Sequence, residues 1–295
     1  MSKPSTDNDT DISFIRDVWS LGKPGLSSLV IFTTGGGVFL AGGNPDIWTI
    51  LSSVIGTTMV VASANSLNNY IERESDKLMA RTRVRPLPSG RMEPWVALVY
   101  GIVLMVIATP WMALHTTTMA ASLAVIAWAV YVFLYTPMKR RSWLNVLVGG
   151  IAGAMPPLIG WTAVTGSIDA PGMALFAVLF LWQMPHSLAI SMYLKEEYTA
   201  AGLKVLPAEV SDAVTRVHIF AYVVALVGVS LYLAELGLGG MVTIIGSAVL
   251  GIPFLWKAWR GLRTKGDAVW ARDLFLYSLL YLSGLFVVMA VDHVL

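Results

Sequence analysis

The chain has 295 residues, of which 56% are hydrophobic and only 13% are charged. A soluble domain carries about 25% charged residues, so this composition excludes an ordinary soluble protein and indicates an integral membrane protein. The net charge of +2 gives no support to nucleic-acid binding. The absence of cysteine excludes disulfides, thiolate nucleophiles and iron–sulfur clusters.

The N-terminal stretch MSKPSTDNDTDISFIRDVWS is polar and contains acidic residues. It lacks the apolar core of a signal peptide and the acid-poor character of a transit peptide. We therefore expect residues 1–25 to be a cytoplasmic tail and residues 26–295 to form a single transmembrane domain. Because no targeting extension precedes this tail, the expected location is a prokaryotic cell (inner) membrane.

Nine apolar stretches follow the tail, each close to the length of about 20 residues that crosses a bilayer. They lie at 26–43, 47–68, 94–111, 114–136, 143–164, 172–194, 215–236, 239–256 and 271–292. The expected fold is an all-α integral membrane protein of nine transmembrane helices, with its N-terminus in the cytoplasm.

The distribution of basic residues supports this topology. All 20 Lys and Arg residues fall in five segments, at 1–25, 69–93, 137–142, 195–216 and 257–272. Nine spans place these five segments on one side of the membrane, which is the asymmetry that the positive-inside rule predicts for cytoplasmic loops.

The end of the second span carries a regular series of oxygen-bearing side chains. Asn68, Glu72 and Asp76 recur every four residues, so on an α-helix they form one stripe about 12 Å long. Oxygen ligands suit Mg²⁺, which is normally shared with phosphate oxygens. We predict that these three residues are metal ligands with a catalytic role.

Arginines follow this stripe in the next loop, at Arg81, Arg83, Arg85 and Arg91. The guanidinium group matches the geometry of phosphate, so stripe and arginines together predict a metal-bridged diphosphate site at the membrane surface. The alternative is a capped helix end followed by an ordinary basic loop.

Two further residues lie where the fourth span ends. Tyr135 offers a neutral hydroxyl and Lys139 a compact cation, a pair suited to holding and protonating a leaving diphosphate. A lysine and an interfacial tyrosine at a cytoplasmic helix end are also a common topology signal. The pair therefore indicates a functional site only in combination with the Asn68–Glu72–Asp76 stripe and the arginines that follow it.

The sixth span contains Trp182, Gln183 and His186 and leads to Glu196 and Glu197. His186 and Glu197 are eleven residues apart, close to three helical turns, so a continuous helix would place them on one face. Ionisable residues inside membranes are usually functional. The motif predicts an aromatic-lined cavity that contacts a flat aromatic cofactor; the alternative is a histidine hydrogen-bonded between helices.

These motifs resemble those of the UbiA superfamily of intramembrane prenyltransferases. NNYIERESDKLMARTRVRPLPSG at 68–90 resembles the motif shared across the superfamily, and WQMPHSLAISMYLKEEYTAAGLKVLP at 182–207 resembles the branch that modifies haem. The resemblance implies a bundle with a cavity open to the cytoplasm and to lipid. It implies farnesyl diphosphate as donor, haem B as acceptor, haem O as product and Mg²⁺ as activating ion, with haem A synthase as a partner.

The chain departs from the family pattern at two places. Glu72 stands where the family usually has Asp, which affects the details of metal coordination. Glu197 stands where an Asp precedes the tyrosine. Relatives that act on quinone precursors carry a second Asp-rich motif after span 6, for which Glu196 and Glu197 are the main candidates here, as a second carboxylate site.

The resemblance implies a reaction in which the donor ionises and the resulting cation adds to the acceptor. In that scheme Arg81, Arg85, Lys139 and Lys23 bind the diphosphate, and His186, Trp182 and Gln183 bind the haem.

Two rival functions are a prenyltransferase acting on an aromatic quinone precursor such as 4-hydroxybenzoate, and a transporter or channel. The second is disfavoured because no span carries Lys or Arg near mid-membrane.

Overall fold

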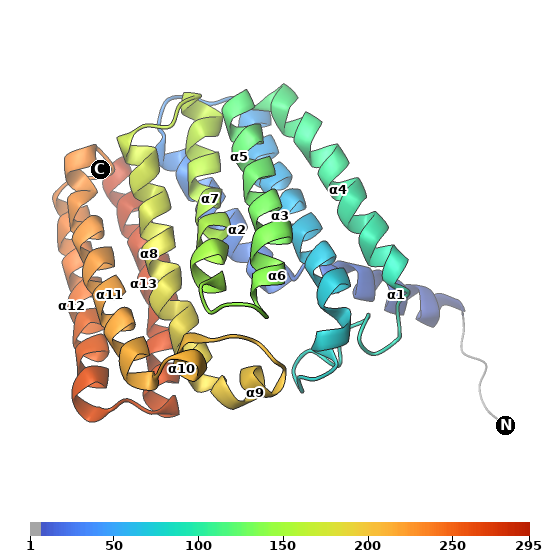
Figure 1. Cartoon of the computed structure of the whole chain (residues 1–295). Coiled ribbons are helices and arrows are strands. Elements are labelled where there is room, and N and C mark those ends of the chain that lie inside the picture. The colour runs from blue at the N-terminus through green and yellow to red at the C-terminus, as the bar shows by residue number, and fades with distance from the viewer. Residues whose placement is uncertain (1–6) are drawn as a thin grey trace.

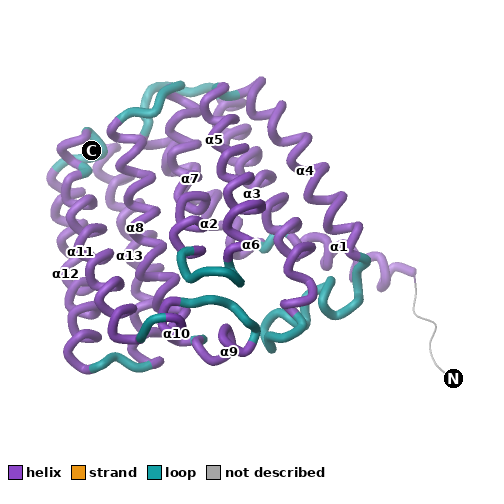
Figure 2. Tube along the Cα trace, viewed as in Figure 1, coloured by secondary structure: helices purple, strands orange, loops and turns teal. Residues whose placement is uncertain are grey.

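The computed structural model describes the backbone of residues 7–295 and the side chains from residue 14 onward. Within this range the chain is helical, with loops and turns between the helices and no strand (Figures 1 and 2). The predicted tail therefore begins outside the described residues, and Lys3, one of its basic residues, lies there too.

The helices follow one another in a simple order. They are α1 (Asp7–Leu21), α2 (Pro24–Leu40), α3 (Ile47–Asp76), α4 (Pro94–His115), α5 (Thr118–Ala129), the π-helix η1 (Val130–Tyr135), α6 (Thr136–Met138), α7 (Asn145–Thr165), α8 (Ala170–Tyr193), α9 (Lys195–Ala200), α10 (Leu206–Glu209), α11 (Asp212–Tyr232), the 3₁₀-helix η2 (Ala234–Leu236), α12 (Met241–Thr264) and α13 (Ala268–Val294).

Eight helical stretches in the described part of the chain are long and apolar enough to cross a membrane. They are α3, α4, the continuous stretch Thr118–Met138, α7, α8, α11, α12 and α13. Helix α2 is apolar but has only 17 residues, the lower end of the spanning range. The all-helical membrane architecture is confirmed, and the ninth crossing stays a prediction.

Several predicted boundaries differ from the structure. Helix α3 continues eight residues beyond position 68, so the whole oxygen stripe is helical. The turn before α5 lies at Thr116 and Thr117 rather than at 112–113. Helix α1 was not predicted at all, because its low hydrophobicity conceals it within a polar tail.

Large apolar side chains cover the outside of the bundle. Val106 on α4 and Val249 and Ile252 on α12 are each 65% exposed. Exposed apolar surface on this scale is costly in water but is the expected outer face of a helix in lipid.

The two largest clusters of buried side chains form most of the core. The larger joins α8, α11, α12 and α13, and includes Val178, Leu226, Phe254 and Tyr281. The smaller joins α3, α4, α5 and α7 around Met112. Contacts of α7 with α8 and of α2 with α13 connect the two halves of the bundle.

Helices α2 and α7 meet at very close range, at glycine residues. A Cβ atom at Gly37 would lie 2.1 Å from the carbonyl oxygen of Pro157, so only glycine allows this approach. Helix α7 continues without a break through Pro156 and Pro157 to Thr165.

We expect Gly37→Ala to destabilise the protein by about 1–3 kcal/mol, because the added methyl group overpacks the α2–α7 contact. The matched control is Gly35→Ala on the same helix, where a Cβ atom meets nothing within 4 Å. Thermal unfolding in nanodiscs measures both. Equal melting temperatures for the two variants would contradict the packing argument.

The longest loops lie at one end of the bundle. Segments 77–93 and 194–211 come together there with α1, while the C-terminus lies at the opposite end (Figures 1 and 2). We call this end, with these three segments, the basic side. The two segments were predicted to share one side of the membrane, and in the fold they lie at the same end of the bundle.

Candidate active site

The oxygen stripe of α3 is buried inside the bundle near the basic side. Asn68 is fully buried, Asp76 is 2% exposed and the Glu72 side chain is 14% exposed. Buried carboxylates and amides are costly unless they are paired. The partners of these three residues therefore define the site.

Asn68 binds the ammonium group at the start of α2. Lys23 Nζ donates to Asn68 Oδ1 at 2.9 Å, and Asn68 Nδ2 donates to Thr136 Oγ1 at 3.2 Å. Lys23 has a left-handed backbone, with φ 51°, at the junction between α1 and α2. The amide thus orients a lysine that is 45 residues away in the sequence.

Glu72, one turn further along α3, binds the second ammonium group. Lys139 Nζ lies 2.9 Å from Oε1 and 3.1 Å from Oε2 of Glu72. The same ammonium lies 4.7 Å from the centre of the Tyr135 ring, within the range of a cation–π contact. The predicted pair of Tyr135 and Lys139 is therefore assembled beside the oxygen stripe.

Asp76 at the end of α3 binds a guanidinium from the following loop. Arg85 Nη1 donates to Asp76 Oδ2 at 2.7 Å, and Thr82 Oγ1 donates to the backbone carbonyl of Asp76 at 2.8 Å. This pair folds the loop back over the helix end. Arg85 therefore faces the same site as Lys23 and Lys139.

A cavity of about 480 Å³ opens next to these groups. Five cations and two carboxylates line it: Lys23, Arg81, Arg85, Lys139, Lys204, Glu72 and Asp76. Asn68 is not among the lining residues, which favours a supporting role through Lys23 over the direct metal ligation predicted from the sequence. The excess of positive charge makes the cavity suitable for a polyanion.

A π-helical segment forms one wall of this cavity. Helix η1 carries Tyr131 and Tyr135, both of which line the cavity, with ring centres 5.0 Å apart. Tyr131 also donates from its hydroxyl to Asn65 Oδ1 at 3.3 Å. π-helical segments are rare and occur often at functional sites. Sequence reasoning missed Tyr131 because a π-helix has no clear sequence signal.

The segment after α8 closes the cavity on the basic side. The backbone amide of Arg81 donates to Glu197 Oε1 at 3.4 Å, and the amide of Lys204 donates to the carbonyl of Lys139 at 2.8 Å. Tyr198 lines the cavity, whereas Glu196 is exposed and neither glutamate is a lining residue. The structure therefore places Glu197 of α9 in contact with the loop 77–93.

Helix α8 presents one face to the cavity, through Gln183, Ser187, Ile190 and Ser191. This spacing is that of a single helical face. The Gln183 amide lies over Gly153, where a Cβ atom would be 2.1 Å from Gln183 Oε1. A side chain at position 153 would therefore displace the Gln183 amide from this position.

Trp182 and His186 lie on the adjacent face of α8 and do not line the cavity, contrary to the prediction. Trp182 Nε1 donates to the carbonyl of Ser278 at 2.6 Å, and His186 Nδ1 lies 2.8 Å from Ser278 Oγ. Both side chains pack against α13. The expected common face of His186 and Glu197 is also wrong, because α8 ends at Tyr193.

The electrostatics of the two lysines differ. Burial, followed by the charges of Lys139 and Arg85, lowers the pKa of Lys23 to about 7. Burial also disfavours the charged form of Lys139, but Tyr135 and Glu72 outweigh it and hold the pKa of Lys139 above its ordinary value. Lys139 therefore keeps its positive charge, whereas a bound polyanion would stabilise the charged form of Lys23.

The donor set fits a magnesium ion shared with phosphate oxygens. In residues 14–295 no group of three or more His, Asp or Glu side chains is arranged to hold a metal alone. Magnesium commonly binds one or two carboxylates together with substrate phosphates and water. Glu72 and Asp76 supply two carboxylates, and Arg85 contacts only Oδ2 of Asp76.

Comparison with known proteins supports the resemblance seen in the motifs. The protoheme IX farnesyltransferase of Myxococcus xanthus (strain DK1622) is 47% identical over 279 residues, 94% of this chain and 95% of that protein. The protein of the same name from Gloeobacter violaceus (strain ATCC 29082 / PCC 7421) is 37% identical over 282 residues, 95% of this chain and 92% of its own.

Solved structures share the fold at low sequence identity. A digeranylgeranylglyceryl phosphate synthase superposes with a TM-score of 0.81 at 18% identity, covering 95% of this chain and 98% of its own. A UbiA homologue from Archaeoglobus fulgidus, bound to DMAPP and Mg²⁺, gives 0.68 at 14% identity, covering 93% and 99%. Residues 29–279 match the UbiA prenyltransferase family, and with these close relatives the match establishes that the chain belongs to that family.

Proposed function

We propose that this protein transfers the farnesyl group of farnesyl diphosphate to a vinyl group of haem B, with addition of water, to give haem O. The observation that carries the proposal is the polyanion-binding cavity of α3, found in a chain that aligns over 94% of its length with a protoheme IX farnesyltransferase. The site is proposed to face the cytoplasm, because the basic side of the bundle carries it.

In this proposal the cations of the cavity bind the diphosphate of the donor. Lys139, Arg81, Arg85 and Lys23 surround the space next to the stripe. Their charges stabilise the negative charge that develops on the diphosphate as the carbon–oxygen bond breaks, in a site arranged before the reaction begins.

The proposed metal site uses Glu72 and Asp76, with Asn68 orienting Lys23 beside them. A magnesium ion held there would supply Lewis-acid stabilisation of the leaving diphosphate. The chain itself would supply two negatively charged carboxylates to that ion. Lys139 positions the carboxylate of Glu72, and Arg85 positions that of Asp76.

The acceptor half of the cavity is lined by the α8 face and by Tyr131. The farnesyl cation adds to the terminal carbon of the vinyl group, which moves the positive charge to the carbon next to the porphyrin ring. Water then bonds to that carbon and releases a proton, which completes the hydroxyethylfarnesyl substituent. Gln183, Ser187 and Ser191 are the polar side chains of α8 that line this space.

The proposal is tested with purified protein in nanodiscs, farnesyl diphosphate, Mg²⁺ and either haem B or 4-hydroxybenzoate as acceptor. We expect haem O, identified by mass spectrometry, and no product from the phenol. Farnesylated 4-hydroxybenzoate without haem O would instead assign the protein to the quinone branch. Inclusion of haem A synthase tests its predicted role as partner.

For haem binding, we expect Gln183→Leu to weaken affinity about tenfold, the effect of one lost hydrogen bond of about 1.4 kcal/mol. His186→Ala is expected to leave haem affinity and the Soret band unchanged, since His186 contacts Ser278 rather than the cavity. Haem titration followed by absorbance measures both variants. A shifted Soret band in His186→Ala would restore the histidine as a haem ligand.

A further inference from the structure

A second cavity lies between α1 and the loop 77–93, next to the candidate active site. It has a volume of about 270 Å³. This is below the range of about 300–1,000 Å³ for pockets that hold drug-sized ligands, so it suits a group of the size of a phosphate rather than a porphyrin or a farnesyl chain. Lys23 and Arg85 line both cavities.

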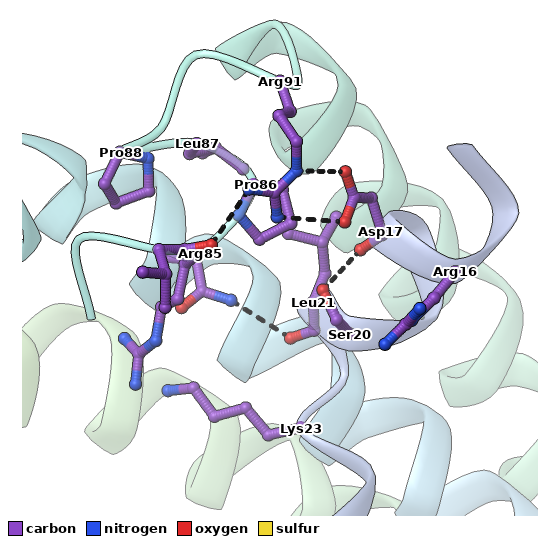
Figure 3. Close-up of a pocket in the computed structure, with 12 residues that line it drawn as sticks. Arg16, Asp17, Ser20, Leu21, Lys23, Arg85, Pro86, Leu87, Pro88 and Arg91 are labelled. Atoms are coloured by element: carbon purple, nitrogen blue, oxygen red, sulfur yellow. Dashed lines mark hydrogen bonds and ion pairs between the residues drawn. The ribbon is translucent and has the colours of Figure 1, made fainter. Parts of the chain in front are cut away.

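The lining of this cavity is strongly basic. Arg16, Lys23, Arg85 and Arg91 face it, against a single carboxylate, Asp17. In Figure 3, Lys23 from the start of α2 and Arg85 from the loop converge at one edge, and Arg16 projects from α1. Four cations against one carboxylate give this recess a net positive charge, which attracts anions.

Two of these cations are already paired. Asp17 accepts hydrogen bonds from Arg91 Nε at 3.0 Å and Nη2 at 3.2 Å (Figure 3). Arg85 binds Asp76 on its other side. Neither Arg16 nor Lys23 forms an ion pair with any carboxylate whose side chain the structure describes. Two positive charges in the cavity are thus left without a counter-charge among residues 14–295.

An unsatisfied polar group points to a ligand independently of the charges. Asn69 lines the cavity and is 5% exposed. Its Nδ2 donates to the carbonyl of Leu21 at 3.2 Å, but its Oδ1 has no hydrogen-bond partner among the described residues. A buried acceptor without a partner is costly, and the hydroxyl of a protonated phosphate or of a glycerol headgroup would satisfy it.

The walls of the cavity are held in place by apolar packing. Leu21 of α1 packs with Leu87 and Met92 of the loop and with Ala97 of α4. The Arg91–Asp17 pair fastens the loop to α1 at a second point. Helix α1 is therefore a docked element of the site, which explains why a polar segment folds against the bundle.

From these observations we propose that the cavity between α1 and the loop 77–93 is a second anion site, which binds a phosphate group through Arg16, Lys23 and Asn69. Its position beside the active site favours inorganic diphosphate leaving the catalytic cavity past Lys23 and Arg85. The phosphate of an anionic lipid headgroup has the same chemistry, and the two sources are separated by experiment.

The test uses Arg16→Gln, because Arg16 lines only this cavity. Arg83→Gln is the matched control: Arg83 is an exposed arginine of the loop 77–93, on the other side of this cavity from α1, and it lines neither cavity. Inorganic pyrophosphate is titrated calorimetrically into protein in phosphatidylcholine nanodiscs, with EDTA present to remove metal-dependent binding. We expect binding to wild type and to Arg83→Gln, and binding about tenfold weaker in Arg16→Gln, as for one lost charge-assisted hydrogen bond.

A second arm identifies the source of the phosphate. Protein from nanodiscs containing phosphatidylglycerol is analysed by native mass spectrometry, and the pyrophosphate titration is repeated in those nanodiscs. If the pyrophosphate affinity is the same in phosphatidylglycerol nanodiscs as in phosphatidylcholine nanodiscs, the ligand of the site is the diphosphate leaving group. If wild type but not Arg16→Gln retains a phosphatidylglycerol molecule, and this lipid weakens pyrophosphate binding, the ligand is the lipid headgroup. If Arg16→Gln matches wild type in both arms, or nothing binds, the proposal is overturned. Neither arm uses a farnesyl donor or haem, so this outcome is independent of the proposed function.

Discussion

Asp76→Asn is expected to reduce kcat for farnesyl transfer by about 10³-fold, the scale of loss when one preorganised charge-stabilising group is removed. Asp76 is buried, and it is one of two carboxylates proposed to hold the metal. The asparagine keeps the shape of the side chain and can still accept from Arg85, so the fold should persist. Haem O formed in nanodiscs at saturating Mg²⁺ is quantified by chromatography with mass spectrometry.

The matched control for this variant is Glu74→Gln. Glu74 is an exposed carboxylate two residues away on α3, paired with Lys77 at the surface. We expect normal turnover from it, since exposed ion pairs contribute little. Turnover of Asp76→Asn above a tenth of wild type, in protein with an unchanged melting temperature, would remove Asp76 from the metal site.

Lys139→Gln is expected to lower kcat/KM for farnesyl diphosphate by about 10²-fold, equivalent to about 2.7 kcal/mol. The ammonium is held by Glu72 and Tyr135 at the edge of the cavity, where its charge acts on the diphosphate in a largely dehydrated site. Initial rates over a range of donor concentrations measure the effect. The Mg²⁺ concentration for half-maximal rate should stay close to that of wild type.

Two further variants distinguish a catalytic loss from a structural one at Lys139. Lys139→Arg keeps the positive charge and should recover part of the activity. Arg140→Gln removes an exposed charge from the neighbouring position and should leave kcat/KM unchanged. If Lys139→Arg is as inactive as Lys139→Gln although both proteins remain folded, charge neutralisation is not the role of this residue.

Part of the site could be predicted because it depends on local periodicity. The side chains of Asn68, Glu72 and Asp76 share a helical face whatever the rest of the chain does, provided that the helix continues. The structure shows that it does. Lys23 and Lys139 were predicted as diphosphate ligands, yet their positions against Asn68 and Glu72 bridge 45 and 67 residues of sequence and arise from helix packing.

The α8 motif shows where periodicity alone is insufficient. Trp182, Gln183 and His186 are close in sequence, but successive helical residues differ by about 100° in direction. Which face turns inward is decided by the neighbouring helices: Ser278 of α13 binds Trp182 and His186, and the cavity receives Gln183. The break at Leu194 then separates Glu197 from this helix.

The sequence by itself determined the membrane class, the helical architecture, the basic side and the residues of the α3 stripe. These follow from hydropathy, charge distribution and helical repeat, which are properties of neighbouring residues. Only the tertiary structure decided the π turn at Tyr131, the docking of α1 and the direction of each face of α8. Those features depend on contacts between distant segments, because a buried polar group must find its partner wherever the packing of the bundle places one.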